Sequence, residues 1–420
     1  MRNMKDMKEL FEMALGLGTE WHVTDITLSP EEHRIDISLD FDRGTKFPCP
    51  KCDTPGCGVH DTLERTWRHL NFFEFETYLH ARMPRVSCDR CGVHQVTVPW
   101  ARPGSGFTLF FESLAMALMR MMPVEAAAKI LNVWSTRLWR LLHRQIDGEL
   151  ASLDLSDVRY VGVDETSSRK GHNYITVFAN LEQNRVIHVA EGRGIDTLES
   201  FRSHLEIHGG HADQMELFSC DMSTTFTAGI LAHFPGAEIV YDRFHVVKLV
   251  QKALDQVRRE ERLRDPKLAQ TKYIWLRNPE NLSATQKVRL EELTRPAHHL
   301  QTARAWAIKE SFRDIFREND LACAHACFRH WYFWATHSRL APMIRVAKGL
   351  KNHQDRILRS VETGVSNGIL EGLNSLIQAA KAKARGFRTL KNLKAACYLV
   401  GGKFELGISH LWWMTHTRCY

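Results

Sequence analysis

The chain has 420 residues, of which 44% are hydrophobic and 25% are charged; these values exclude a globally disordered protein, and the length allows about two to four domains. A formal net charge of +7 and a pI near 8.9 permit a polyanionic partner without requiring one. No window reaches the roughly 18 consecutive apolar residues of a membrane helix, and residues 1–19 lack the apolar core of a secretory signal, so we expect a cytoplasmic protein with no membrane partner.

The first element that the sequence predicts is a β-hairpin within residues 21–41. Hydrophobic and polar side chains alternate around a turn at 29–32, and Ile35 and Ile37 share one face. A second strand-rich stretch covers residues 72–86. Both stretches belong to a predicted N-terminal β module.

Two Cys-x-x-Cys pairs flank the second strand-rich stretch: Cys49 and Cys52, then Cys88 and Cys91. Each pair can form a tight turn, and four converging thiolates suit tetrahedral Zn²⁺ of a structural kind, because they leave no open position for water. The gap of about 35 residues exceeds the usual spacing, so a β-hairpin must lie between the pairs. The alternative is four unrelated cysteines. Three further side chains are possible substitute ligands: Cys57, His60 and His94.

Three helical stretches follow a Pro- and Gly-rich linker at 101–106. They are 107–122, 124–131 and 135–149, with Pro123 at a first helical position and Ser135 as a cap. The pattern is typical of a helix-turn-helix, whose last helix would present Arg137, Arg140 and Arg144 to the major groove or to phosphates. A solvated basic face on a packed bundle is the alternative, and the neighbouring zinc module favours DNA binding.

From Tyr160 onward the pattern changes to alternating strands and helices. The predicted order is three strands joined by hairpins, a helix, a strand, a helix and a strand, at 159–164, 173–181, 185–191, 196–207, 215–220, 223–233 and 237–241. This is the order of elements in a ribonuclease-H-like core. In open α/β sheets of this kind the active site lies beyond the carboxyl ends of the strands.

Residues 248–349 are predicted to be largely helical and are rich in charge and tryptophan. A segment of this length cannot be a loop of a compact domain, so we expect a helical domain inserted into the ribonuclease-H-like core. Four tryptophans in this stretch could stack on unpaired bases, although core packing is the favoured interpretation for each of them: Trp275, Trp306, Trp331 and Trp334.

Three carboxylates stand in the contexts expected of metal-binding acids. Asp164 and Asp221 are predicted to end two strands, and Glu371 lies on a helical segment that becomes basic. Acids that converge from strand ends and a helix can hold two divalent cations about 3.5–4 Å apart, which clamp the attacking and leaving oxygens of phosphoryl transfer. The sequence therefore predicts cutting and joining of DNA with two Mg²⁺ or Mn²⁺ ions.

Other acids compete with these three. Asp157 precedes its strand, and Glu165 would point to the opposite face from Asp164. Glu362 competes with Glu371, but the face of Glu371 continues through side chains that suit a phosphate backbone. The predicted DNA-binding set on this face is Asn374, Gln378, Lys381 and Arg385, with Lys383 beside it. A merely solvated basic face is the alternative.

Several motifs together resemble the bacterial insertion-sequence transposases of the ISL-three type. They are Asp-Glu-Thr-Ser-Ser-Arg-Lys-Gly-His-Asn-Tyr at 164–174, Asp221-Met222-Ser223, Asp242-Arg243-Phe244-His245, and Ser366-Asn367 before Glu371, Asn374 and Gly386. The cysteine module and the helix-turn-helix stand in that family's order, so the resemblance covers nearly the whole chain.

The resemblance implies an acidic-triad (DDE) transposase, with Asp164, Asp221 and Glu371 as metal ligands. Its partners would be terminal inverted repeats and target DNA, and it would need no nucleotide cofactor. When bound to DNA it would lie at the bacterial nucleoid. The resemblance also draws attention to Asp242 and His245, an Asp-x-x-His element of related transposase groups. His245 could steady a metal-binding carboxylate or contact a phosphate, and a histidine packed in the core is the alternative.

The predicted function is therefore two-metal hydrolysis at an element's ends followed by strand transfer, in a homodimer or larger assembly because two ends must be brought together. The alternatives are a non-catalytic DNA-binding regulator and a nuclease or resolvase with the same core. The predicted domains are a β and zinc module (1–100), a helix-turn-helix (104–150), a ribonuclease-H-like core (157–247 and 355–408), a helical insertion (248–350) and a tail (409–420).

Overall fold

The computed structural model describes residues 2–169, 171, 173–364 and 368–406. The chain divides into two compact units, one formed by Met1–Leu150 with the segment from Phe404, and the other by Ala151–Lys403. Parts of the predicted motifs lie outside the described residues: Lys170, His172, Ser366, Asn367 and the tail 409–420.

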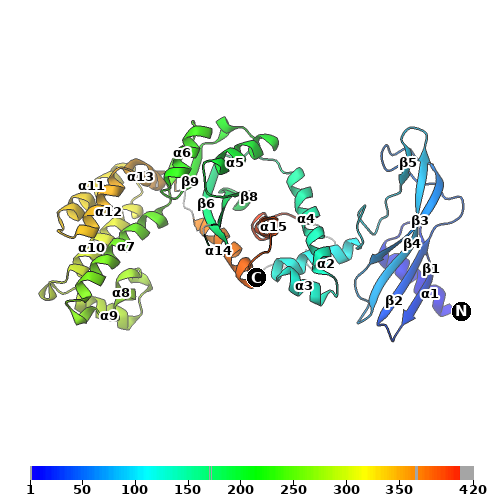
Figure 1. The fold of residues 1–420 in the computed structure, drawn as a ribbon, viewed down its shortest axis with the longest axis horizontal. Helices are drawn as coiled ribbons and strands as arrows, with labels where there is room; N and C mark the ends of the chain where they lie inside the picture. The colour runs from blue at the N-terminus through cyan, green and yellow to red at the C-terminus, as the bar shows by residue number, and fades with distance from the viewer. Residues whose placement is uncertain (1, 170, 172, 365–367, 407–420) are drawn as a thin grey trace. The chain divides into compact units, whose positions relative to one another are not determined.

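The first unit begins with a helix and a five-stranded sheet (Figure 1). Its elements are α1 (Arg2–Leu15), β1 (His22–Ser29), β2 (Arg34–Asp40), β3 (Gly58–Arg68), β4 (Glu76–Cys88) and β5 (Gly92–Gln95). The strand order is β1-β2-β4-β3, with β5 paired to β4. The antiparallel pairs β1–β2 and β3–β4 confirm the predicted N-terminal hairpin and the hairpin between the cysteine pairs, whereas α1 was not predicted.

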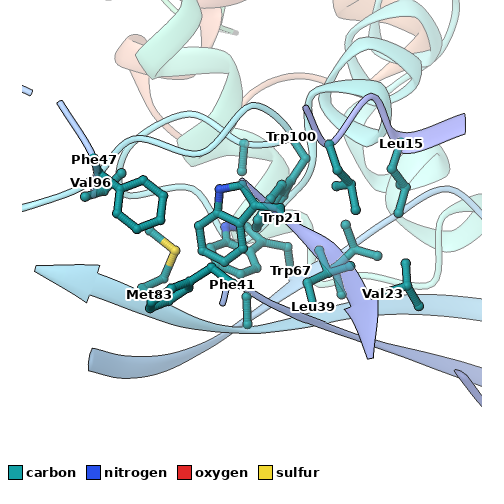
Figure 2. Close-up of a cluster of buried hydrophobic side chains, with 14 of the residues drawn as sticks. Leu15, Trp21, Val23, Leu39, Phe41, Phe47, Trp67, Met83, Val96 and Trp100 are labelled. Atoms are coloured by element: carbon teal, nitrogen blue, oxygen red, sulfur yellow. The ribbon is translucent and has the colours of Figure 1, made fainter. Parts of the chain in front are cut away.

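The core of this sheet is built around three tryptophans, which Figure 2 shows in close packing. The ring of Trp100 lies 4.9 Å from that of Trp21 and 5.6 Å from that of Trp67, both in edge-to-face orientation. Ile35 and Ile37 of β2 are buried, as their alternation predicted. Edge-to-face pairs are a favoured aromatic geometry, so these contacts stabilise the module beyond the area they bury.

Three helices complete the first unit: α2 (Leu109–Met121), α3 (Val124–Ile130) and α4 (Ser135–Ala151). The hydroxyl of Thr108 accepts a hydrogen bond from the backbone of α2 and caps it. Pro123 precedes α3 as its cap and Ser135 is already helical, so both start signals are displaced by one residue from their predicted roles. The predicted succession of three helices is confirmed.

The second unit contains a mixed five-stranded sheet with the order β10-β9-β6-β7-β8 (Figure 1). Its strands are β6 (Tyr160–Arg169), β7 (Asn173–Asn180), β8 (Arg185–Glu191), β9 (Leu217–Cys220) and β10 (Glu238–Tyr241), and the helices between them are α5 (Asp196–Ile207) and α6 (Thr224–His233). β7 is antiparallel to β6 and β8, whereas β9 is parallel to β6 and β10. The order of elements along the chain is the predicted one.

A long helical stretch follows β10. Its α-helices are α7 (Arg243–Arg262), α8 (Lys272–Leu276), α9 (Ala284–Leu293), α10 (Gln301–Asp314), α11 (Leu321–His337), α12 (Ala341–Lys351) and α13 (Gln354–Thr363). Trp275 and Trp331 are fully buried, and their ring N–H groups donate to Thr271 and to the carbonyl of Ile308. These two tryptophans pack in the helical core, as the favoured interpretation predicted.

The last helices return to the sheet: α14 (Gly368–Lys383) and α15 (Leu390–Gly401). Leu370 of α14 lies so close to Gly162 of β6 that a Cβ at position 162 would collide with its side chain. A glycine inside a strand often marks such a close approach. Within the described ranges, no helix has the length and apolar character needed to cross a membrane.

Candidate active site

The sheet register aligns three aspartates, one on β6 and the other two directly after β9 and β10. Gly162 of β6 is paired with Ser219 of β9, and extending this register by two residues aligns Asp164 with Asp221. Tyr241 of β10 is paired with Cys220, so the next residue, Asp242, stands beside Asp221. Parallel strands lie about 4.8 Å apart, so the backbone positions of the three aspartates form one row across the sheet.

Asp164 does not end its strand, which corrects the prediction that β6 stops there. β6 continues to Arg169 because its pairing with β7 goes on beyond Asp164, which is itself paired with Val177. Only the pairing with β9 stops before Asp164. Asp221 does follow the last residue of β9, as predicted.

Backbone amides fix the orientation of these carboxylates. The amide of Glu165 donates to Asp164 Oδ1 at 2.8 Å, and the amide of Ser223 donates to Asp221 Oδ1 at 3.0 Å. Asp242 caps α7 by accepting from the amide of Phe244 at 3.1 Å. One oxygen of each carboxylate is therefore held by the chain itself.

Helix α14 lies against β6 through a ladder of polar contacts. Asn374 Nδ2 donates to Asp164 Oδ2 at 2.5 Å, one turn from Glu371. Further along, Gln378 donates to the hydroxyl of Thr166, and Lys381 donates to the carbonyl of Ser167 at 2.6 Å. The polar face of α14 is thus occupied by β6, whereas it was predicted to lie along a phosphate backbone. Lys383 and Arg385, at and beyond the end of α14, are exposed.

Glu371 carries a buried oxygen, Oε1, that has no hydrogen-bond partner among the described residues. Burial raises the pKa of Glu371, and the negative charge of Asp242 adds to the rise. Asn374 Oδ1 is likewise buried without a partner in the described chain. Unpaired buried acceptors are costly, and a bound cation is one way to satisfy them.

The two aspartates of the row also resist ionisation. Burial raises the pKa of Asp164 to about 6, and the charge of Asp221 contributes to the rise. The pKa of Asp221 is raised as well, first by burial and also by the charge of Asp242. Buried acids with raised pKa values that lie near one another are typical of functional sites.

His245 is the basic side chain beside this cluster. Its Nδ1 donates to Asp242 Oδ2 at 2.8 Å, and Asp242 is only 4% exposed. This hydrogen bond is the main reason why the pKa of His245 is raised, and the nearby charges of Asp164 and Asp221 add to it. Asp242 therefore positions His245 beside the two aspartates.

The first unit holds a tighter cluster. The sulfur atoms of Cys49, Cys52, Cys88 and Cys91 all lie within 4.8 Å of one another. In the described part of the chain this is the only group of three or more His, Cys, Asp or Glu side chains that is so close, so the acids of the second unit are more widely spread. Four converging thiols fit tetrahedral Zn²⁺ without another ligand.

The hydroxyl of Thr54, 3.1 Å from Cys52 Sγ, lowers the pKa of this thiol to about 6. The hydrogen bond with Cys52 in turn raises the pKa of the Cys91 thiol, and the thiolate is the form that binds a metal. Cys57 instead lies 3.5 Å from the carbonyl of Thr54, and burial raises its pKa. The three possible substitute ligands, Cys57, His60 and His94, are not part of the four-cysteine cluster.

Two of the three arginines predicted to reach DNA from α4 contact other residues of the first unit. Arg137 lies over the ring of Phe107 at 4.2 Å, and Arg144 pairs with the carboxylate of Glu112, which is 3% exposed. Arg140 is exposed, and its Nε donates to the carbonyl of Thr136 at 3.4 Å. The sequence could not reveal this, because Phe107 and Glu112 are far from α4 along the chain.

The role of Gly162 was not predicted, although the sequence carries a signal for it. Gly162 interrupts a run of strand-forming residues two positions before Asp164. It leaves the space that Leu370 fills, and Leu370 directly precedes Glu371. Gly162 therefore allows α14 to approach the aspartates.

Comparison with known protein families gives three matches. A family model described as transposase matches residues 161–397. A model for the zinc finger of the transposases of IS204, IS1001, IS1096 and IS1165 matches residues 45–91, and a model for the helix-turn-helix domain of transposase family ISL3 matches residues 96–146. The cysteine cluster lies within the second match, α2, α3 and most of α4 lie within the third, and the three aspartates lie within the first.

Two curated relatives are similar over most of their length. The transposase for insertion sequence element IS1001 of Bordetella parapertussis is 29% identical over 349 residues, which cover 81% of this chain and 85% of the relative. The transposase for insertion sequence element IS1557 of Mycobacterium tuberculosis is 28% identical over 370 residues, covering 80% and 81%.

Proposed function

Because the chain belongs to the ISL3 family of DDE transposases, we propose that it binds the terminal inverted repeats of an insertion sequence, cleaves the DNA there and joins the freed end to target DNA. The observation that carries this proposal is the alignment of Asp164 with Asp221 beside a helix that bears Glu371 and whose Asn374 contacts Asp164. We propose that these acids, from separate elements, act as one site.

The second unit supports a ribonuclease-H-like core. Its sheet has three antiparallel strands in sequence, followed by two strands parallel to the first on the other side. The helices α7–α13 lie between β10 and α14, where we propose a helical insertion domain. In this arrangement the insertion separates the first two acids of the triad from the third in the sequence.

We propose Asp164, Asp221 and Glu371 as the residues that hold two Mg²⁺ or Mn²⁺ ions. The donor set fits these ions because hard cations prefer carboxylate oxygens, and Glu371 Oε1 is buried without a partner in the described chain. When bound, such ions activate the attacking oxygen and stabilise the leaving oxygen at phosphorus.

The protein's own groups perform the positioning. Asn374 and the amide of Glu165 hold Asp164, and the amide of Ser223 holds Asp221. Asp242 keeps Nδ1 of His245 occupied, so Nε2 is the atom that His245 can turn to a phosphate oxygen. Arg140, Lys383 and Arg385 are exposed cations suited to the DNA backbone.

The binding partners are inferred from the zinc module and the helix-turn-helix. We propose that the cysteine cluster holds structural Zn²⁺. The zinc module and the helix-turn-helix together would bind double-stranded DNA. Two element ends must be brought together, so a homodimer is the smallest sufficient assembly. With DNA as its substrate, the protein would work in the bacterial cytoplasm, at the nucleoid.

The test is incubation of the full chain with a labelled terminal-repeat duplex in Mg²⁺ or EDTA. Wild type should nick the duplex only with the metal, and Glu371→Gln should bind it equally well without nicking. Glu362→Gln is the matched control, because Glu362 is an exposed acid of α13 paired with Arg359. Full cleavage by Glu371→Gln would remove Glu371 from the site.

The same assay separates the alternatives. A target duplex in the reaction should give strand-transfer products. Nicks without transfer would favour a nuclease or resolvase, and binding without nicks would favour a regulator.

A further inference from the structure

The turn of the helix-turn-helix presents a large aromatic side chain to solvent. Trp134, between α3 and α4, is 81% exposed, and Ile130 at the end of α3 is 62% exposed. Exposed tryptophans are uncommon because the side chain loses much by remaining in water. This one lies in the module whose match is to a DNA-binding domain.

The backbone around Trp134 is fixed. The amide of Val133 donates to the carbonyl of Ala128 at 3.0 Å, and the amide of Arg137 donates to the carbonyl of Trp134 at 2.9 Å. Asn132, whose φ of 51° places it in the left-handed region, donates from its side chain to Glu76 of β4 at 2.5 Å. The backbone of the turn is therefore held in place and tied to the sheet, and the indole of Trp134 is presented to solvent.

The neighbouring exposed side chains are polar or cationic. Thr136 and Arg140 lie one turn apart on the face of α4 opposite the buried Leu138 and Leu142. Lys129 is exposed on the adjacent helix α3. An apolar ring flanked by cations suits DNA, because the cations can meet phosphates while the ring enters the groove.

We infer that Trp134 is a sequence-reading residue that packs against the methyl groups of thymines in the major groove of the terminal repeats, beside Thr136 and Arg140. This inference rests on the proposed DNA substrate and adds the residues that read it. The first residues of the second helix approach base edges in this fold, and the C5-methyl of thymine is the apolar feature of the groove. Arg137 and Arg144, which are tied to Phe107 and Glu112, do not take this role.

The experiment replaces each thymine of the repeat, one at a time, with deoxyuridine, which removes the methyl group and keeps base pairing. Binding is measured in EDTA, so it does not depend on cleavage. Wild type should bind about fourfold more weakly at one or two positions, which corresponds to one lost methyl contact. Trp134→Ala should bind the natural repeat about tenfold more weakly and should be insensitive to deoxyuridine at those positions.

Phe73→Ala is the control, because Phe73 is an exposed aromatic of the same unit, 85% exposed and outside the helix-turn-helix. It should keep the wild-type deoxyuridine profile. A flat profile in wild type, or an unchanged profile in Trp134→Ala, would overturn the inference while leaving cleavage untouched. Loss of dimer formation in Trp134→Ala with an unchanged profile would instead assign the indole to a protein interface.

Discussion

The thiol cluster of the first unit and the acidic site of the second are assembled in opposite ways. Four cysteines come from two short turns at the ends of one hairpin, and their sulfurs already lie within 4.8 Å of one another. The acids come from β6, from the residue after β9, and from α14, which the helices α6 to α13 separate from β9 along the chain; these acids are more widely spread than the thiols. A site built from turns is fixed by local geometry, whereas a site built across a sheet depends on the whole topology.

The largest expected effect tests the local nature of the thiol cluster. Cys91→Ser should release zinc, expose the segment 45–91 to proteases and abolish specific DNA binding. Structural zinc contributes about 10–16 kcal/mol of folding free energy in small zinc modules, so one lost ligand should unfold this one. Metal analysis and limited proteolysis measure both results.

Cys57→Ser is the matched control for that variant. Cys57 belongs to the same module but lies outside the four gathered thiols, so zinc content should remain at one per chain. If Cys91→Ser keeps its zinc and Cys57→Ser loses it, the ligand set must be redrawn.

The next effect tests whether the acids act as one site. Asp164→Asn should lower the rate of Mg²⁺-dependent cleavage by at least about 10²–10³-fold while repeat binding is unchanged, because the DNA-binding modules lie in the other unit. Glu165→Gln is the neighbouring control. Strand alternation points Glu165 away from the contacts that Asp164 and Thr166 make with α14, so its loss should cost less than about tenfold. An equal loss of cleavage rate in both variants would contradict the assignment of Asp164, and not Glu165, to the active site.

The contrast between a local site and a site built across a sheet explains how much of each site the sequence could predict. The spacing of the cysteines was sufficient, because the ligands and the hairpin between them are contiguous. The identity of the acids could be read from their contexts, but the end of β6 could not, because pairing with β7 decides where that strand stops. The contacts of Arg137, Arg144 and Lys381 depend on partners distant in the chain, and an isolated basic pattern cannot distinguish them from DNA-facing residues.

A smaller effect concerns acid sensitivity of the second unit. His188 of β8 and His204 of α5 lie with ring centres 4.5 Å apart, and burial lowers the pKa of His188 to about 3 and that of His204 to about 4. Unfolded histidine titrates near 6.5, so the unfolded chain binds more protons below that pH. The stability from these neutral rings is complete above about pH 6.5 and is lost as the pH falls towards 4.

Denaturant titrations of the full chain between pH 7 and pH 4 measure this loss. Each pKa unit corresponds to about 1.4 kcal/mol, so the second unit should lose a few kcal/mol across the window. His188→Phe should reduce the slope of stability against pH, whereas His330→Gln, an exposed histidine of α11, should leave it unchanged. The zinc module also loses its metal in acid, and following zinc release separately distinguishes the two causes. An unaltered slope in His188→Phe would contradict this assignment.

The smallest effect tests the contact that joins the third acid to the sheet. Gly162→Ala should destabilise the second unit by about 1–3 kcal/mol, because the new Cβ would collide with Leu370 and Leu181. Leu370 directly precedes Glu371, so cleavage should fall further than the change in stability explains. Gly372→Ala is the opposite case on α14 itself: a Cβ there meets no atom within 4 Å, and alanine should stabilise the helix by up to about 1 kcal/mol. The free energy of unfolding and the cleavage rate are measured for both variants. If both variants cleave DNA at the same rate, the close approach of α14 to β6 does not determine the position of Glu371.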